Sequence, residues 1–358
     1  MRTVQTNSIH MLIGIPGSGK SVYARELEQT TRGVIVSTDA IRLKLFGGES
    51  RQKNTYVIFD EAFSEIEAAL TAGRDVIFDA TNVDRDRRSK FLKRFADYPV
   101  QAHVFDTLYE TASRRISSRK RKLDDKILSK YAKNLQFPLP GEGFAALLPV
   151  HRPDGSVLYG IEPGIESDIS ARSVLSRPGQ ASKNAAAHRA DDLRTAIERL
   201  LRQEAGHDEL FECLSAFPLF AQMLGYDQGN PYHSRTLSRH TYAVLEYVNA
   251  FYEENDRLQM QWTALLHDIG KPFCKTWKEA RGYYSYFGHE HVSASIGCHL
   301  LKALGYSDDF TLDVAGRIEC HMEILHGGDA GASNIYHLLG GEKLAKMYFF
   351  AEADTYGK

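Results

Sequence analysis

A glycine-rich segment near the N-terminus has the residue types that bind the phosphates of a nucleoside triphosphate. Residues 14–21 read Gly-Ile-Pro-Gly-Ser-Gly-Lys-Ser and fit the P-loop pattern, between an apolar run and a helix-forming stretch. The glycines of this pattern let backbone N–H groups turn toward a phosphate, and the helix adds its positive dipole end. We expect Lys20 to neutralise the β- and γ-oxygens and Ser21 to ligate Mg²⁺. The residues predicted to bind ATP, or another nucleoside triphosphate, are Gly14, Gly17, Ser18, Gly19, Lys20 and Ser21.

Two aspartates follow later apolar runs, where side chains open onto the ligand crevice of a parallel sheet. Asp39 could accept the proton of an attacking hydroxyl, or it could cap a helix. Arg42, about one helical turn later, would share its face and could hold a phosphate. Asp79 has the position of a Walker-B-type acid that reaches the Mg²⁺ shell, with helix capping as the alternative.

A basic run at residues 114–122 places Arg115 and Arg119 four residues apart, on one face of an expected helix. Two guanidinium groups so placed could form a lid over the triphosphate and stabilise charge that develops during phosphoryl transfer. The alternative is a solvated helix face, which is the usual role of a charge run.

The order of these motifs resembles the 5′-kinase domain of polynucleotide kinases, over roughly residues 8–160. The resemblance implies that Asp39 is the general base and that Arg42 grips the substrate phosphate next to the 5′-hydroxyl. It also matches Lys20 and Ser21 to the family's P-loop residues, Asp79 to its strand-end aspartate, and Arg115 and Arg119 to its lid arginines.

Histidines and carboxylates in the second half form a candidate metal site. Imidazole and carboxylate together are ligands for divalent cations, which turn water into a nucleophile near neutral pH. His267 and Asp268 are adjacent, so on one helix they diverge by only about 100° and can both face an ion. Lys271 could then steady a phosphate oxygen. The remaining candidates are His240, His289, His321 and Asp354; any one of them alone would be more typical of a structural residue.

In order, this set resembles the HD phosphohydrolase superfamily, with its His…His-Asp…Asp pattern at His240, His267, Asp268 and Asp354. His289 and His321 match the positions that hold a second metal in dinuclear members, so the resemblance implies one or two divalent transition-metal ions. Residues 264–273 and 286–290 are similar to the HD domain attached to tRNA nucleotidyltransferases, which has 2′,3′-cyclic phosphodiesterase and phosphatase activity.

The elements that must position these residues change in character along the chain. Four short apolar runs alternate with helical stretches before residue 110, which predicts an α/β P-loop kinase domain with a parallel sheet flanked by helices. A polar stretch at residues 176–187 is typical of a linker, and helical patterns follow it. We therefore predict a kinase domain at 1–165, a connecting segment at 166–204 and an all-α HD domain at 205–358.

Composition agrees with a two-domain globular protein. Residues 1–165 contain 25 Lys+Arg and 20 Asp+Glu, whereas residues 166–358 contain 19 and 26, and ten of the 14 histidines follow residue 205. No apolar run approaches the roughly 20 residues that cross a bilayer, and no signal-peptide pattern is present. The four cysteines lack metal or redox spacing. We expect a cytoplasmic protein with no membrane partner.

A 5′-kinase and a metal phosphoesterase in one chain predict nucleic-acid end repair. The expected substrates are RNA or DNA ends with a 5′-hydroxyl and a 3′-phosphate, 2′-phosphate or 2′,3′-cyclic phosphate, and a polynucleotide ligase is the expected partner. The alternative is a nucleoside or sugar kinase fused to an HD nucleotidase. A third interpretation is a non-catalytic nucleotide-binding module with an HD sensor, against which the complete catalytic sets argue.

Overall fold

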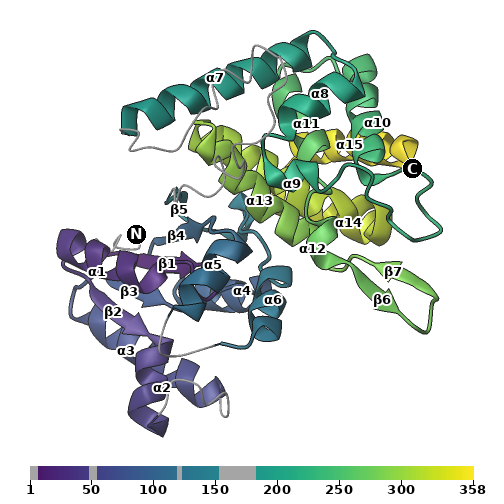
Figure 1. Cartoon of the computed structure of the whole chain (residues 1–358). Coiled ribbons are helices and arrows are strands. Elements are labelled where there is room, and N and C mark those ends of the chain that lie inside the picture. Colours follow the sequence, from purple (N-terminus) through teal and green to yellow (C-terminus); the bar gives the residue numbers. More distant parts are fainter. Residues whose placement is uncertain (1–6, 48–54, 119–122, 153–182) are drawn as a thin grey trace. The chain divides into compact units, whose positions relative to one another are not determined.

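The computed structural model describes residues 7–47, 55–118, 123–152 and 183–358. The chain divides into two compact units, residues 1–150 and residues 151–358 (Figure 1). No described helix is both long enough and apolar enough to cross a membrane.

The first unit is built on a five-stranded parallel sheet with strand order β2-β3-β1-β4-β5. Its strands are β1 (Ile9–Ile13), β2 (Val34–Ser37), β3 (Val76–Asp79), β4 (Val100–Phe105) and β5 (Ala146–Val150). Asp79 is in register with both Leu12 of β1 and Ser37 of β2. The carboxyl ends of these three strands therefore meet at one edge of the sheet.

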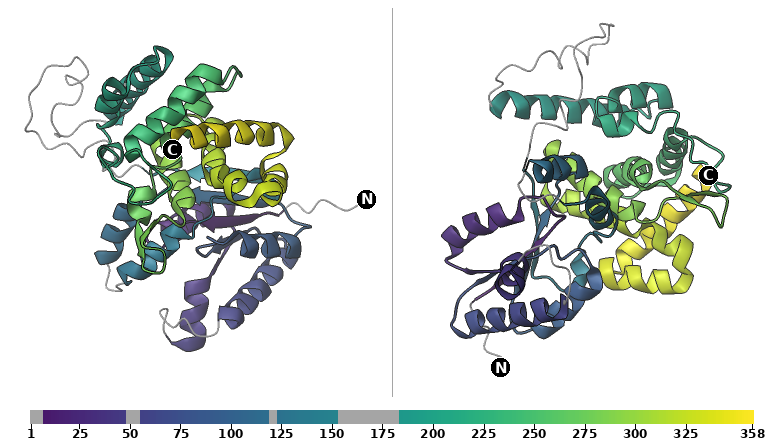
Figure 2. Two further views of the ribbon diagram at one scale, coloured as in Figure 1. Left: turned by 90° about the vertical axis from the view of Figure 1, so that its right-hand side faces the viewer. Right: turned by 60° about the horizontal axis from the view of Figure 1, so that its bottom comes forward.

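Helices connect the strands and lie on both sides of the sheet (Figure 2), which is the layering that parallel strands require. They are α1 (Lys20–Thr31), α2 (Thr38–Phe46), α3 (Thr55–Thr71), α4 (Arg85–Arg94), α5 (Tyr109–Ser117) and α6 (Asp125–Lys133). A short 3₁₀ turn, η1 (Pro140–Glu142), precedes β5. The predicted fold class of this unit is confirmed.

The fifth strand was not predicted, because its residues 146–150 contain Pro149 and follow a proline-rich segment. β5 lies at the edge of the sheet, where a proline without an N–H group is tolerated. The interior of the sheet is more conventional: every residue of β1 is buried. Helix α4 packs on the sheet through aromatic rings: Phe78 of β3 stacks on Phe91 of α4 with ring centroids 5.1 Å apart.

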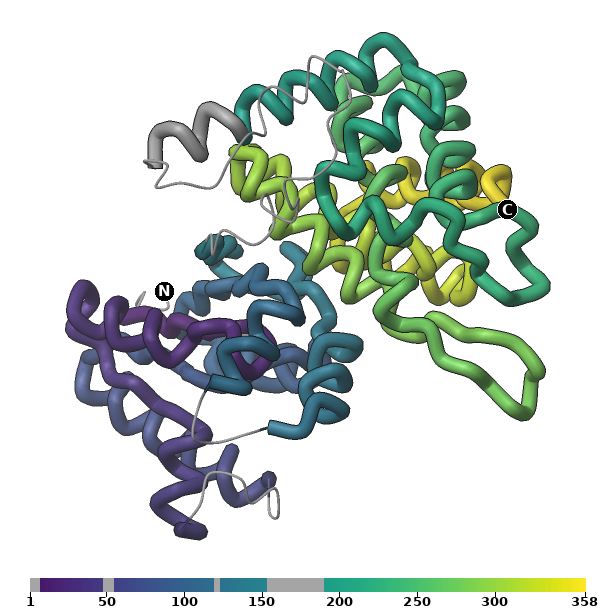
Figure 3. The backbone as a smooth tube through the Cα atoms, viewed as in Figure 1, coloured from purple at the N-terminus to yellow at the C-terminus, as the bar shows by residue number. Residues whose placement is uncertain are grey.

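The second unit is helical, as predicted. Its helices are α7 (Lys183–Arg202), α8 (His207–Leu214), α9 (Pro218–Ala221), α10 (Leu237–Phe251), α11 (Arg257–Leu266), α12 (Lys271–Cys274), α13 (His289–Ala303), α14 (Asp308–Leu339) and α15 (Gly341–Gly357). Figure 3 traces how α14 packs along α13 and α15, while α10 packs against α11 and α15. An antiparallel hairpin of β6 (Thr276–Lys278) and β7 (Tyr283–Ser285) is inserted between α12 and α13.

Part of the predicted connecting segment is helical, and its bounds stay a prediction. Residues 183–202, which we assigned to the connecting segment 166–204, form the 20-residue helix α7. Residues 153–182 lie outside the described part of the chain, so the rest of the predicted linker is not described here. The sequence around 183–187 reads as a linker because it is polar and rich in alanine, yet alanine also favours helix.

Candidate functional sites

The loop between β1 and α1 has the backbone geometry of a phosphate-binding turn. Gly17 and Gly19 have φ values of 83° and 98°, in the left-handed region that favours glycine. A Cβ atom at Gly17 would also lie 2.7 Å from the carbonyl oxygen of Ala112 in α5. Both positions therefore require glycine, one of them because α5 packs directly on the loop.

Lys20 lies inside this loop. Its side chain is buried, and Nζ donates hydrogen bonds to the carbonyl oxygens of Gly14 and Ile15 at 2.9 and 2.8 Å. A third contact joins Nζ to the Ser18 hydroxyl at 3.2 Å. The ammonium group is thus held where it can face the phosphates that a P-loop encloses.

Ser21 and Asp79 come together at the edge of the sheet. The Ser21 hydroxyl donates a hydrogen bond to Oδ2 of Asp79 at 2.8 Å. Burial raises the pKa of Asp79, and the bond from Ser21 and the charge of Lys20 oppose that shift. A hydroxyl and a carboxylate are oxygen ligands of the kind that Mg²⁺ prefers, so the pair fits the predicted ion.

Asp39 lies in the first turn of α2 and forms an ion pair with Arg42. The distance between Arg42 Nη1 and Asp39 Oδ1 is 2.5 Å, and the Asp39 side chain is 57% exposed. Asp39 does not cap the helix, because the hydroxyl of Ser37 accepts the bond from the Ala40 N–H. Ser37, two residues before Asp39, is in register with Asp79 on the neighbouring strand, and the charge of Asp39 raises the pKa of Asp79.

The predicted capping role of Asp79 is likewise not observed, since Asp84 accepts the N–H of Arg87 at the start of α4.

Arg115, on α5, reaches the P-loop: its Nη1 donates to the carbonyl oxygens of Ser18 at 3.3 Å and Gly17 at 3.5 Å. Arg119, the second lid candidate, lies outside the described residues.

In the second unit, the predicted histidines and aspartates converge on one buried cluster, which we call the HD centre. The two carboxylate oxygens of Asp268 contact different pairs of histidines. Its Oδ2 lies 3.1 Å from Nε2 of His240 and 3.2 Å from Nε2 of His267. Its Oδ1 lies 3.2 Å from Nε2 of His289 and 3.9 Å from Nε2 of His321. The two groups therefore share one carboxylate, which is suited to bridging two cations.

Asp354 completes the first group, with Oδ1 3.2 Å from Nε2 of His240 and 3.8 Å from Nε2 of His267. All members of the HD centre are buried, at 6% exposure or less. The centre draws on α10, α13, α14 and α15 and on the residues directly after α11. Helix packing therefore brings together predicted ligands that are more than 110 residues apart in the sequence.

Backbone carbonyls fix the orientation of three imidazole rings. The Nδ1 atoms of His267, His289 and His321 donate to the carbonyl oxygens of Ala264, Tyr286 and Ile318, at 2.9, 2.9 and 2.6 Å. With Nδ1 protonated, each neutral ring presents the lone pair of Nε2 to the centre. This is the arrangement that supports metal-ligating histidines, so the residues fit one or two divalent cations.

The electrostatics of the HD centre keep carboxylates ionised in a buried site. Burial by itself raises the pKa of Asp268, but its interactions with His267, Lys271 and His240 outweigh burial and hold that pKa well below its usual range. Burial lowers the pKa of His321 to about 3, and neighbouring His289 and His267 act in the same direction. The pKa of His240 moves the other way: its hydrogen bonds to Asp268 and Asp354 outweigh burial and raise it to about 9. An ionised carboxylate at Asp268 and a neutral imidazole at His321 are the states in which such groups bind metal.

Lys271 lies at the rim of the HD centre and has contacts that the sequence did not predict. Its Nζ is 2.7 Å from Oδ2 of Asp268 and 2.8 Å from Oε1 of Gln228. His233 Nε2 follows at 3.4 Å. Gln228 and His233 belong to the loop between α9 and α10, and no motif in the sequence marks them. Only tertiary packing brings them to Lys271.

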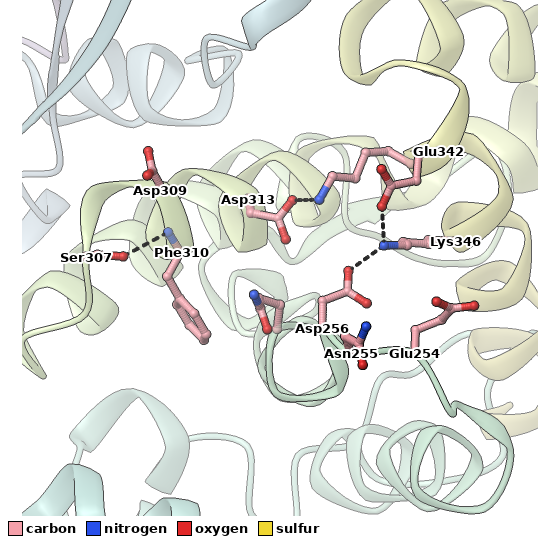
Figure 4. A pocket seen from close by; sticks show the side chains of 11 residues that line it. Glu254, Asn255, Asp256, Ser307, Asp309, Phe310, Asp313, Glu342 and Lys346 are labelled. Atoms are coloured by element: carbon pink, nitrogen blue, oxygen red, sulfur yellow. Dashed lines mark hydrogen bonds and ion pairs between the residues drawn. The ribbon is translucent and has the colours of Figure 1, made fainter.

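A separate surface pocket of about 730 Å³ lies among α11, α14 and α15 (Figure 4). Its lysines are already paired, because Lys343 binds Asp313, and Lys346 contacts Asp256 and Glu342 at 2.9 and 2.7 Å. None of the predicted site residues lines this pocket. We therefore interpret this pocket as part of a structural network of ion pairs.

Comparisons with known families agree with this division of the chain. Residues 9–138 match the family model of an AAA domain, and residues 233–353 match that of the HD domain. The first match spans the P-loop, Asp39, Asp79 and Arg115. The second spans every member of the HD centre except Asp354, which lies one residue beyond its end.

Two curated relatives are tRNA nucleotidyltransferases. The CC-adding enzyme of Thermus thermophilus is 29% identical over 108 residues, which cover 30% of this chain and 24% of the relative. The A-adding enzyme of Deinococcus radiodurans is 31% identical over 80 residues, or 22% of this chain and 18% of the relative. The chain thus spans a quarter or less of the length of these relatives.

Among solved structures, a chain of the Pnkp1/Rnl/Hen1 RNA repair complex is 27% identical over 37% of this chain and 45% of that chain, with a TM-score of 0.35. A shared P-loop or HD core implies use of nucleotide and of divalent metal. The chain joins a kinase-like P-loop domain of the AAA type to an HD phosphohydrolase domain.

Proposed function

We propose that this protein repairs the ends of broken nucleic acids. The P-loop unit transfers the γ-phosphoryl group of ATP to a 5′-hydroxyl, and the HD unit removes a 3′-phosphate, a 2′-phosphate or a 2′,3′-cyclic phosphate. The observation that carries the proposal is the Asp39–Arg42 pair beside Ser21 and Asp79. This pair supports the proposal because a carboxylate that accepts a proton and a guanidinium that binds a phosphate are what a phosphorylated acceptor strand requires.

In the kinase reaction, Asp39 accepts the proton of the 5′-hydroxyl as its oxygen attacks the γ-phosphorus in line. The new P–O bond forms as the bond to the β-phosphate oxygen breaks, and ADP leaves. Lys20 and Arg115 neutralise charge on the transferred group from the loop side. Ser21 and Asp79 would hold Mg²⁺, which supplies further charge neutralisation on the phosphate oxygens.

Arg42 has two roles in this scheme. Its Nη1 lies 2.5 Å from Oδ1 of Asp39 and so orients the carboxylate that accepts the proton. Its planar guanidinium can also bind a phosphate bidentately, and the acceptor strand carries one next to its 5′-terminal nucleoside. A free nucleoside or sugar lacks that phosphate, which favours the polynucleotide over the small-molecule alternative.

In the HD unit, the two groups that share Asp268 would hold one or two divalent cations. Such ions lower the pKa of bound water and polarise a phosphoryl oxygen. Lys271, whose Nζ lies 2.7 Å from Oδ2 of Asp268, would bind a phosphate oxygen of the substrate. The buried walls exclude bulk water and strengthen these interactions.

The two activities make complementary products. One leaves a 5′-phosphate and the other a free 3′-hydroxyl, which are the ends that a polynucleotide ligase joins, so we propose a ligase as the downstream partner. The two curated relatives are both named for tRNA, which supports RNA as a substrate of the HD unit.

The kinase assignment is tested with [γ-³²P]ATP, Mg²⁺ and a 5′-hydroxyl oligonucleotide. The wild-type protein should label the oligonucleotide, and Asp39→Asn should abolish labelling while ATP binding is kept. Asp60→Asn, at an exposed aspartate on α3, is the matched control and should label normally. Phosphorylation of nucleosides or sugars with no labelling of oligonucleotides would establish the small-molecule alternative instead.

The HD assignment is tested with oligonucleotides that end in a 3′-phosphate or a 2′,3′-cyclic phosphate. Asp268→Asn should stop phosphate release and leave the kinase reaction intact, because the two sites use different residues. His326→Ala changes an exposed histidine of α14, the helix that carries His321, and should keep both activities. Loss of both activities in Asp268→Asn would contradict independent centres.

A further inference from the structure

A hairpin beside the HD centre combines exposed aromatic rings with cations. Strands β6 and β7 project from the helices of the second unit (Figure 1), and the residues that join them are exposed. Nothing in the proposed mechanism uses this hairpin. A structural role for it would call for buried apolar side chains, whereas all three residues of β6 are exposed.

Three aromatic side chains of this region are open to solvent. Trp277 on β6 is 50% exposed, and its ring meets Tyr284 of β7 with centroids 5.0 Å apart. Tyr232, from the loop before α10, is 64% exposed and packs edge-on against Tyr283, with the two hydroxyl oxygens 3.2 Å apart. Phe287, just after β7, is 73% exposed.

Cations lie among these rings. Lys275 places Nζ 4.4 Å from the ring centre of Tyr284, and Lys278 and Arg281 are exposed in the hairpin itself. Glu279 is the only acidic residue between Lys271 and His289, against three Lys and Arg. Residues 166–358 as a whole carry more acidic than basic residues, so this segment is basic against the trend of its unit.

Both ends of the hairpin segment are anchored in the HD centre. Lys271, which contacts Asp268, begins the short helix that leads into β6, and His289 begins the helix that follows β7. Tyr286 is buried between them and donates a hydrogen bond to the carbonyl oxygen of Gln228, whose side chain accepts from Lys271. A strand lying on the hairpin would therefore have its end close to the centre.

We propose that the hairpin and Tyr232 form a binding surface for the single-stranded 3′ end of a polynucleotide. Bases stack on exposed aromatic rings, and phosphates bind the Lys and Arg groups between them, so rings and cations in alternation match the repeat of a nucleic-acid strand. This inference rests on the proposed function and identifies how the HD unit selects polynucleotide ends over small phosphate esters.

Binding is measured by the anisotropy of a 5′-labelled single-stranded RNA of 10–12 nucleotides with a 3′-phosphate, in EDTA to prevent turnover. Trp277→Ala should weaken binding about 10-fold, since stacking contributes about 1–3 kcal/mol per base. Trp277→Phe keeps an aromatic ring and should bind nearly as the wild type does. Tyr348→Ala removes a ring of similar exposure on α15, at 46%, and serves as the control.

Electrostatic contacts have their own signature. Lys278→Ala and Arg281→Ala should each lower the slope of log affinity against log salt concentration by about 0.7, the value for one phosphate contact on a single strand. Hydrolysis of p-nitrophenyl phosphate, which reaches only the HD centre, should be unchanged in the hairpin variants, while KM for the RNA rises.

Equal RNA binding by Trp277→Ala and Tyr348→Ala would overturn the proposal, as would wild-type protein that does not bind the strand. A parallel loss of p-nitrophenyl phosphate hydrolysis would also overturn it, because the hairpin would then only support the centre. If the RNA binds through the hairpin but no divalent ion gives phosphate release from it, the binding surface stands and the proposed function fails.

Discussion

The hydroxyl of Ser21 donates a 2.8 Å hydrogen bond to the carboxylate of Asp79, although 58 residues separate the two in the sequence. Ser21 follows β1 through the P-loop, and Asp79 is the last residue of β3, the neighbouring strand. Parallel pairing places both at the same edge of the sheet. The two oxygens thereby meet beside the ammonium group of Lys20, whose charge acts on Asp79.

The first prediction concerns this pair. Asp79→Asn should raise the Mg²⁺ concentration that half-saturates 5′-phosphorylation by about 10- to 100-fold, because the carboxylate is one of the two proposed oxygen ligands. A titration of Mg²⁺ in the oligonucleotide-labelling assay measures the change. Asp60→Asn should have an unchanged Mg²⁺ requirement. The same requirement in both variants would show that Asp79 does not act on the ion.

The Ser21–Asp79 contact also shows how far local pattern predicts the first unit. The P-loop motif indicates the strand before it and the helix after it, and the carboxyl ends of parallel strands lie at one edge of a sheet. The contact between Ser21 and Asp79 could therefore be predicted. The Ser37 cap of α2 could not be chosen over Asp39, because both residue types cap helices and only the backbone decides. β5 was not predicted because a proline within a short apolar run argues against a strand, although an edge strand tolerates it.

The second prediction addresses the arginine that reaches the P-loop. Arg115→Ala should lower kcat for 5′-phosphorylation by about 100-fold or more, since its guanidinium is placed to neutralise charge that develops on the phosphoryl group. Arg115→Lys should recover part of the loss. The adjacent Arg114 is exposed and its guanidinium donates to the hydroxyl of Thr111 on its own helix, so Arg114→Ala is the control. Equal kcat values for the two alanine variants would contradict the assignment.

The third prediction concerns the shared carboxylate of the HD centre. His321→Ala should reduce bound Mn²⁺ from about two ions per chain to about one, because it disrupts only the group at Oδ1 of Asp268. Metal analysis after equilibrium dialysis gives the count, and His326→Ala should match the wild type. A full complement of ions in His321→Ala would rule out the two-group arrangement.

The HD centre was more predictable in its members than in its surroundings. Each ligand stands in a recognisable motif, such as His267-Asp268 or Gly288-His289. The supporting contacts carry no such mark: carbonyls of Ala264, Tyr286 and Ile318 orient the rings only because helices place them there. The β6–β7 hairpin was missed for a related reason, since three-residue strands give too short an alternation to detect.

The fourth prediction is a pH dependence of stability in the first unit. His103 on β4 is buried, with Nδ1 2.8 Å from the hydroxyl of Tyr23 and Nε2 3.0 Å from Nδ1 of His10. Burial, followed by the charge of His10, lowers the pKa of His103 from 6.5 to about 4. The unfolded chain therefore binds a proton more readily than the folded one, so stability is full above pH 6.5 and falls as the pH drops toward 4.

By pH 5 this single group should reduce the free energy of unfolding by about 2 kcal/mol. His103→Gln removes the titration, so its disadvantage relative to the wild type should shrink by that amount between pH 7 and pH 5. Calorimetry of the full chain includes the unfolding of the first unit. Fluorescence reports only on the second, which holds both tryptophans, Trp262 and Trp277. A constant difference between the two proteins across this range would mean that His103 does not take up its proton on unfolding.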